Sequence, residues 1–248
     1  LGDVYKRQEL ARDEHAMTAF RMAHMAMFVQ MQKSRPEYEL SQHSWRAFQL
    51  AYQLVTLASL IDEQSYDREI VDLLWVPTGG GKTEAYLMLT AFEIFRRRLK
   101  HGEFGAGTAV LTRYTLRLLT SQQFQRAATL ICACELERRK NPMVWGSDTI
   151  TIGLWVGGDT SPNTYAVANQ KYKELLALPE PQNPFQISKC SWCGESLVPS
   201  IQDEDNPAKS YGFVSTNNSF KLFCPSVSCE FHEVLPIGIV DEDLYDHP

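Results

Sequence analysis

The segment from Val76 to Thr83 contains residue types that could bind a phosphate group. It reads Val-Pro-Thr-Gly-Gly-Gly-Lys-Thr and stands between a short apolar run at 70–76 and a run of helical periodicity that reaches about Leu99. Glycines leave backbone N–H groups free to surround an anion, and the positive N-terminal end of the next helix points at the same place. In a loop of this kind, Lys82 reaches the β- and γ-phosphates of a nucleotide and the Thr83 hydroxyl binds Mg²⁺.

One position of this loop departs from the usual phosphate-binding pattern, because Val76 stands where Gly or Ala is common. A competing interpretation is a glycine-rich left-handed turn followed by a chance Gly-Lys-Thr. The strand-like run before the loop and the helix-like run after it favour the phosphate-binding interpretation, since that context is what such a loop requires.

A second group of residues with chemical potential is a set of four spaced cysteines. They form one pair separated by two residues and one pair separated by four: Cys190, Cys193, Cys224 and Cys229. Two such pairs can supply four thiolates to a tetrahedral Zn²⁺, and four protein ligands leave no position for water, so the prediction is a structural zinc site. His232 is an alternative fourth ligand. The competing interpretation is a set of reduced thiols without a metal.

Alternating sequence patterns predict the elements that position these residues. Apolar residues at helical spacing predict helices at 9–33, 44–61, 84–99 and 115–139. Short, nearly continuous apolar runs predict strands at 70–76, 108–112, 149–156 and 235–240. Because helices and strands alternate, we expect an α/β fold with a parallel sheet and crossover helices.

The chain divides by composition into five segments. Residues 1–8 match no fold pattern, and we interpret them as a non-native leader on a fragment of a longer protein. The other expected segments are a helical extension at 9–65, an ATP-binding lobe at 66–179, a zinc-binding insertion at 180–234 and a truncated return strand at 235–248.

Overall composition is that of an ordinary folded protein, with 44% hydrophobic and 22% charged residues. The formal net charge of −6 excludes a uniformly basic nucleic-acid coat but leaves room for a local basic stripe. We expect no membrane association, because no apolar run approaches about 20 residues. The lack of a secretory pattern predicts a cytoplasmic location with reduced thiols.

Residues 77–84, Pro-Thr-Gly-Gly-Gly-Lys-Thr-Glu, resemble motif I of superfamily 2 helicases. The segment 45–49, Trp-Arg-Ala-Phe-Gln, resembles the upstream R-x-x-Q element of those helicases, whose glutamine reads adenine. The resemblance implies a RecA-like lobe in which Lys82 and Thr83 are catalytic. It also implies nucleotide binding by Gln49, Pro77, Thr78, Gly79, Gly80, Gly81, Lys82, Thr83 and Glu84. The alternative for Gln49 is a polar residue on a helix face.

Two further segments resemble the nucleic-acid side of the same helicases. Residues 110–116 are similar to motif Ia, and Gly157-Gly158-Asp159-Thr160 is similar to a later Gly-Gly element. The implied DNA-binding residues are Arg113, Tyr114, Thr115, Arg117, Gln122, Gly157 and Gly158. The residues themselves agree, since a row of donors with local positive charge suits phosphate oxygens. The competing interpretation is a solvated helix face.

A narrower resemblance covers nearly all of residues 9–248. The segments WVPTGGGKTEAYL, RYTLRLLTSQQFQRA and GLWVGGDTSPN are similar to the helicase of the DISARM anti-phage defence system. That family implies an ATP-driven DNA helicase or translocase that works with ATP, Mg²⁺ and other subunits of a defence complex. The alternatives are a P-loop ATPase without nucleic-acid function and a zinc-dependent nucleic-acid-binding module whose loop senses nucleotide.

The segment from Ile237 to Asp243 has the form of a Walker B motif, with Asp241 and Glu242 after an apolar run. The resemblance instead implies that the working acidic motif lies beyond Pro248. On that interpretation, residues 9–248 lack the catalytic carboxylates and the second lobe. We therefore expect this chain to be inactive by itself.

Overall fold

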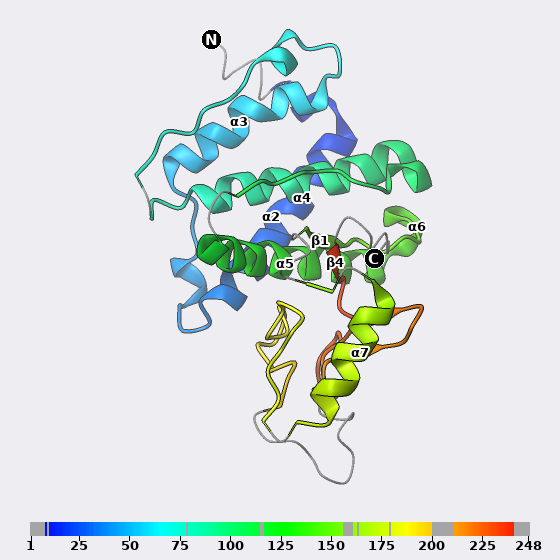
Figure 1. Ribbon diagram of the computed structural model, residues 1–248. Coiled ribbons are helices and arrows are strands. Elements are labelled where there is room, and N and C mark those ends of the chain that lie inside the picture. The colour runs from blue at the N-terminus through cyan, green and yellow to red at the C-terminus, as the bar shows by residue number, and fades with distance from the viewer. Residues whose placement is uncertain are drawn as a thin grey trace. The chain divides into compact units, whose positions relative to one another are not determined.

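The computed structural model divides the chain into two compact units, residues 1–150 and 151–248 (Figure 1). The described residues are 8, 10–77, 79–114, 117–155, 161–162, 164–178, 180–199 and 211–240. Several residues singled out by sequence lie outside these ranges: Thr78, Thr115, Gly157, Gly158, Asp241 and Glu242. Arg117 is the first residue of helix α5.

The first unit is helical in its described part. Its helices are α2 (Glu14–Ser34), α3 (Ala47–Ile61), α4 (Lys82–His101), α5 (Arg117–Lys140) and the short α6 (Pro142–Trp145). Three 3₁₀ turns, η1 (Leu40–Gln42), η2 (Tyr66–Glu69) and η3 (Gly102–Gly105), lie between them. The four long helices confirm the four predicted helical runs. Across the described part of the chain, no helix combines the length and the apolar character needed to cross a membrane.

Helix α2 shows how the sequence selects these elements. The Asp13 side chain caps its N-terminus by accepting a hydrogen bond from Ala16 N at 2.9 Å, which satisfies one of the free backbone donors there. Its buried stripe consists mostly of small residues at helical spacing: Ala16, Ala19, Ala23, Ala26 and Met27. Small side chains let α2 approach α4 and α5 closely, and these three helices form the centre of the unit.

The core of the first unit lies along α4. Met88, Phe92 and Phe95 are fully buried, and Phe95 meets the Trp145 ring edge-on at a centroid distance of 4.9 Å. Burying each such side chain stabilises the fold by about 1.5–3 kcal/mol. Because α4 starts directly after the glycine-rich loop, this packing fixes the direction in which the loop opens.

The prediction of strands at 70–76 and 108–112 is wrong for this structure. Both segments are irregular backbone without strand hydrogen bonds. The side chains of the first one face solvent, since Val71, Leu73 and Trp75 are 91%, 79% and 89% exposed. A strand exists only through hydrogen bonds to a neighbouring strand, and an apolar pattern does not supply that neighbour. A RecA-like sheet that includes these two segments is therefore absent from the described residues.

The second unit contains a small parallel sheet. Strand β1 (Ile152–Trp155) pairs in parallel with β4 (Ile237–Val240), with Gly153 opposite Gly238. The predicted apolar runs 149–156 and 235–240 therefore do form strands, shorter than expected, and the expected parallel pairing of strands is confirmed for them. More than 80 residues separate the two strands in sequence. Their pairing therefore closes a long loop of chain, which contains most of the second unit.

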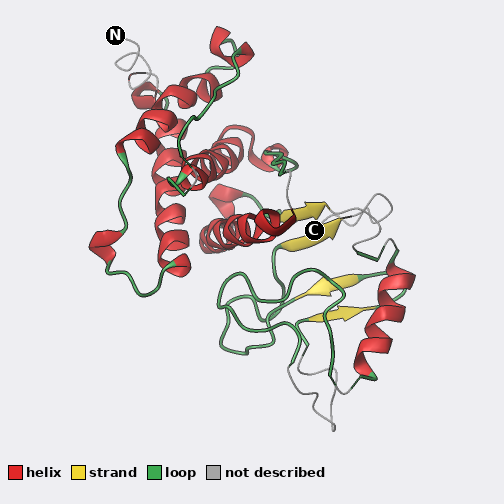
Figure 2. Cartoon of the chain, turned by 60° about the vertical axis from the view of Figure 1, so that its left-hand side comes forward, coloured by secondary structure: helices red, strands yellow, loops and turns green. Residues whose placement is uncertain are grey.

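The described residues of that long loop include a hairpin and a helix. Strands β2 (Phe213–Ser215) and β3 (Phe220–Leu222) are antiparallel, and helix α7 (Tyr165–Leu176) packs against both (Figure 2). Phe185 and Phe213 are buried here, with ring centroids 4.7 Å apart. These aromatic side chains form an apolar core in the same segment of the chain as the four cysteines.

Candidate functional site

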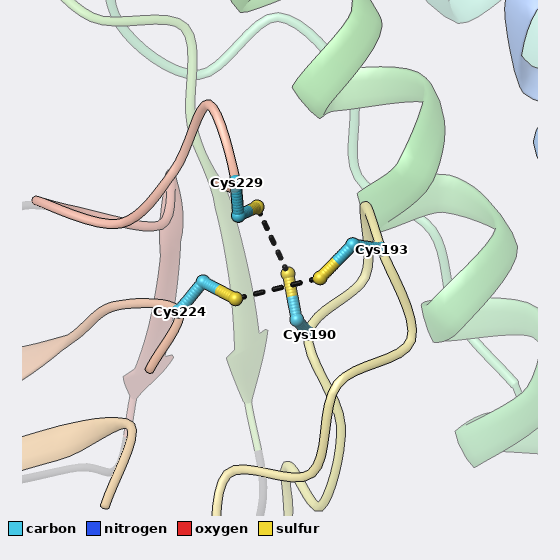
Figure 3. A group of neighbouring side chains, drawn as sticks. All are labelled: Cys190, Cys193, Cys224 and Cys229. Atoms are coloured by element: carbon cyan, nitrogen blue, oxygen red, sulfur yellow. Dashed lines mark hydrogen bonds between the residues drawn. The ribbon is translucent and has the colours of Figure 1, made fainter. Parts of the chain in front are cut away.

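The four predicted metal ligands converge on one point (Figure 3). The Sγ atoms of Cys190, Cys193, Cys224 and Cys229 all lie within 4.8 Å of one another. The Sγ–Sγ distance is 3.9 Å for Cys190 and Cys229 and 3.4 Å for Cys193 and Cys224. Four Zn–S bonds of about 2.3 Å in a tetrahedron place sulfurs about 3.8 Å apart. The cluster therefore has the size of a four-thiolate zinc site.

Local turns bring each cysteine pair into position. In the first pair, Gly194 N donates to Cys190 O at 3.0 Å, and Gly194 has a φ of +80°, which glycine adopts without a steric cost. In the second pair, Cys229 N donates to Ser226 O at 3.1 Å. Both pairs thus sit in tight turns whose side chains point at a common centre.

His232 does not join this group. Its Nδ1 lies 2.8 Å from the Cys224 carbonyl oxygen, and its backbone N–H donates to Cys229 O at 3.0 Å. The imidazole therefore supports the second turn through the backbone, while the four thiols occupy the centre.

Burial and hydrogen bonds shift the pKa values of three of the four thiols. Burial raises the pKa of Cys190 to about 12 and also raises the pKa of Cys224. Burial acts in the same direction on Cys193, but hydrogen bonds from the Glu195 backbone and the neighbouring thiols outweigh it and lower that pKa. A cation bound to all four sulfurs would compensate the charge of the thiolates, which is the chemistry of a zinc site.

The glycine-rich loop has the backbone form that glycine permits. Gly79 and Gly81 have φ values of +79° and +90°. A Cβ on Gly80 would lie 2.7 Å from Val76 Cγ1, and one on Gly81 would lie 2.9 Å from Gln49 Nε2. Gly81 is the N-cap of the 20-residue helix α4. The loop therefore opens directly onto a helix N-terminus, a position that favours anions.

Three side chains, those of Lys82, Arg46 and Gln49, donate hydrogen bonds to the loop's own backbone. Lys82 Nζ donates to the carbonyls of Val76 and Pro77, the latter at 3.1 Å. Arg46 donates to Gly80 O at 2.7 Å, and Gln49 Nε2 donates to Gly81 O at 2.7 Å. Gln49 Oε1 accepts from Arg46 N at 2.8 Å, so both polar ends of this buried amide are engaged. In this arrangement Gln49 shapes the loop.

Thr83 connects the loop to helix α5. Its hydroxyl donates to Gln123 Oε1 at 2.9 Å and accepts from Tyr86 OH at 3.1 Å. The Tyr86 hydroxyl in turn lies 3.3 Å from that of Tyr114. Burial, followed by the hydrogen bond with Tyr86, raises the pKa of Tyr114. The first turn of α4 therefore contacts both the end of the 108–114 segment and α5.

A charged contact accompanies this connection. Glu84, the residue after Thr83, forms an ion pair with Arg126 of α5. Burial lowers the pKa of Arg126, followed by the nearby positive charge of Arg35. Glu84, assigned by sequence to the nucleotide, thus pairs with α5 in this structure.

The candidate DNA-binding residues that the structure describes do not share one environment. Arg113 and Gln122 are exposed, whereas Tyr114 is half-buried against Tyr86. Exposed Arg113 and Gln122 are accessible to a phosphate backbone. Tyr114 is instead part of the contact with Thr83.

Four residues that contact the loop or its helix were not assigned to them from sequence: Arg46, Tyr86, Gln123 and Arg126. Arg46 is the first residue of the R-x-x-Q element, so its position carried a signal. Tyr86 follows Thr83 by three residues, which places it on the same side of a helix. Gln123 and Arg126 belong to the row of donors interpreted as DNA contacts, and no local signal shows that α5 returns to the loop.

Together these features define a mixed α/β protein with a glycine-rich loop at a helix N-terminus and a four-cysteine cluster. The chain resembles DISARM protein DrmA of Bacillus paralicheniformis, with 38% identity over 218 residues. That alignment covers 81% of this chain and 18% of the relative, so the chain spans about a fifth of the length of the protein it matches. No protein-family model matches the chain.

Proposed function

We propose that this chain is the ATP-binding lobe of an ATP-dependent DNA helicase or translocase that acts in anti-phage defence. The observation that carries the proposal is the loop at 77–83, which opens a 20-residue helix with Lys82 and Thr83 in its first turn. The resemblance to a protein named for the DISARM system supports the role in defence. The proposed lobe spans residues 66–179, with the helical extension before it and the cysteine-bearing segment 180–234 after it.

The loop's own hydrogen bonds indicate how a nucleotide would enter. Lys82 Nζ now contacts two loop carbonyls, and phosphate oxygens are stronger acceptors for an ammonium group. We infer that Lys82 exchanges these carbonyls for the β- and γ-phosphates. The N–H groups of the loop and of the first turn of α4 then bind the same anion. Pro77 and the three glycines would shape this cradle.

The residues present also fit Mg²⁺. The Thr83 hydroxyl has two lone pairs, of which one accepts from Tyr86, so one remains for a cation. Bound Mg²⁺ neutralises charge that develops on the phosphates during transfer. The present hydrogen bonds of Gln49 use one amide N–H and one oxygen lone pair, so its second N–H and second lone pair remain for adenine.

Arg113, Arg117 and Gln122 are the proposed contacts to DNA, because guanidinium and amide groups donate well to phosphate oxygens. The four cysteines are proposed to hold one structural Zn²⁺. That metal would add folding free energy to the apolar packing around Phe185 and Phe213, because a bound metal holds both cysteine turns in place. Other subunits of a defence complex are proposed partners.

The test is ATP hydrolysis by the full-length protein with and without DNA. Lys82→Ala should lower turnover roughly 10²–10³-fold, because a preorganised charge contact to the phosphates is lost. Lys100→Ala is the matched control, since Lys100 forms a surface ion pair with Glu63. Unchanged turnover in Lys82→Ala would refute the assignment of the loop.

The DNA part of the proposal has its own measurement. Arg113→Ala should weaken DNA binding and reduce the slope of log affinity against log salt by about 1. Turnover that DNA leaves unchanged would favour a P-loop ATPase without a nucleic-acid role. Function that survives Lys82→Ala would favour a zinc-dependent binding module.

A further inference from the structure

The Thr83 hydroxyl is held by two side chains that a phosphate-binding loop does not require. It donates its proton to Gln123 Oε1 at 2.9 Å, and it accepts a proton from Tyr86 OH at 3.1 Å. Thr83 is only 8% exposed, so these bonds lie in a mostly dry environment. A hydroxyl has one proton and two lone pairs, so this arrangement leaves a single lone pair free.

The direction of the proton matters for cation binding. A hydroxyl binds a cation through a lone pair, and its proton must then point away from the cation. An acceptor that already takes this hydrogen bond fixes the orientation of the hydroxyl before the cation binds. A bound cation also makes the hydroxyl a stronger donor, so the hydrogen bond to the acceptor and the cation contact strengthen each other.

Helix α5 is fixed to α4 at a second point, which makes the position of Gln123 specific. Arg126 pairs with Glu84, the residue directly after Thr83. Gln123 and Arg126 are three residues apart on α5, so they lie on the same side of that helix. Thr83 and Glu84 of α4 therefore both contact α5, through Gln123 and Arg126 respectively.

We infer that Gln123 is a positioning residue for Mg²⁺ at Thr83. Its amide oxygen takes the Thr83 proton and thereby directs the remaining lone pair at the cation. Gln123 touches neither nucleotide nor cation, and it acts through Thr83. This inference rests on the proposed function, since it assumes that the loop binds a nucleotide with Mg²⁺.

The experiment is equilibrium titration of the full-length protein with a fluorescent ATP analogue, in excess Mg²⁺ and in EDTA. The measured quantity is the ratio of the two affinities. Gln123→Ala should reduce this ratio about tenfold and leave the affinity in EDTA unchanged, because loss of a group that orients a metal ligand costs about 10–100-fold in metal affinity. Gln123→Glu should keep the ratio, since a carboxylate also accepts the Thr83 proton.

Two more variants make the result decisive. Gln123→Met keeps the side-chain volume without the amide oxygen and should behave as Gln123→Ala does, so it replaces that variant if the smaller side chain prevents folding. Gln125→Ala is the matched control, because two residues along a helix are about 200° apart and Gln125 lies on another side of α5. It should leave the ratio at its wild-type value.

The outcomes separate this inference from the proposed function. A wild-type ratio in Gln123→Ala and Gln123→Met, with nucleotide binding intact, would overturn the role of Gln123 alone. Equal loss of affinity in Mg²⁺ and EDTA would also overturn it, because Gln123 would then shape the loop without directing the cation. Wild-type protein that binds no nucleotide under either condition would overturn the proposed function and the inference with it.

Discussion

Trp192 donates its indole N–H to Glu230 Oε2 at 2.7 Å. Trp192 lies between the first two cysteines of the cluster, and Glu230 follows the fourth. The hydrogen bond therefore fastens the two metal-binding turns to each other independently of the thiols. The Trp192 ring also packs near Phe231, with ring centroids 5.8 Å apart. The two turns are consequently held together from outside the cluster as well as at its centre.

Trp192→Phe should keep the metal but lower the free energy of unfolding. The ring packing survives in this variant, while the charge-assisted hydrogen bond to Glu230 is lost. Such a bond contributes about 1.5–3 kcal/mol, and exposure of Glu230 places the expected loss at the low end. Urea denaturation of both proteins with zinc measures it. An unchanged free energy of unfolding would show that the two turns do not depend on this contact.

Replacing Cys190 and Cys193 together by Ser should remove the metal. Elemental analysis should find about one Zn per chain in the wild type and none in the variant, because hydroxyls are poor zinc ligands. Cys132→Ala is the control, since Cys132 is a fully buried thiol of α5 outside the cluster. It should keep the metal. Wild-type protein without zinc, whose melting and protease resistance a chelator leaves unchanged, would contradict the zinc assignment.

Gly81→Ala should destabilise the loop through two effects. A non-glycine residue at a φ of +90° costs about 1–3 kcal/mol, and the added Cβ would lie 2.9 Å from Gln49 Nε2. Gly107→Ala separates the effects, because Gly107 has a φ of +93° and no atom within 4 Å of the added Cβ. Chemical denaturation should therefore show a larger loss for Gly81→Ala. Equal losses would mean that the contact with Gln49 adds nothing.

The stability of the first unit should fall as the solution becomes acidic. Burial lowers the pKa of His24, and Trp45 Nε1 donates to His24 Nδ1 at 2.9 Å, which requires the neutral ring. A group with a lowered folded-state pKa contributes stability above its unfolded pKa of 6.5 and loses it as pH falls through the folded value. Thermal melting from pH 7.5 to about 5 measures this effect.

His24→Gln provides the comparison for that measurement. Glutamine has no charge in this pH range, and its amide oxygen can accept from Trp45. The variant should lose part of the decrease in melting temperature on acidification. A decrease as steep as that of the wild type would assign the pH dependence to other groups.

The helices and the loop were accessible from sequence because their signals are local. Glycines before Lys82, Glu84 in the first turn and basic residues near His101 mark the two ends of α4 within a few positions. The cysteine cluster was also accessible, because ligand spacing within each pair reflects the geometry of a metal-binding turn. These features depend on neighbours in the chain.

The remaining features depend on partners that are far away in sequence. Gln123 contacts Thr83 across 40 residues, and neither residue carries a mark of the other. The runs at 70–76 and 149–156 have the same apolar character, yet only the second contains a described strand, because its residues 152–155 find β4. Gln49 was assigned to adenine from its element, whereas its contacts with Arg46 and Gly81 follow from the way α3 meets the loop.

The segment that precedes the loop exposes apolar side chains in an alternating pattern. Val71, Leu73 and Trp75 follow each other at every second position, and all three side chains are at least 79% exposed. Alternating apolar side chains on unpaired backbone form a template to which another extended chain can add. Preparations of this chain should therefore self-associate as concentration rises. Leu73→Lys should reduce this self-association, since charge on an exposed edge discourages such pairing.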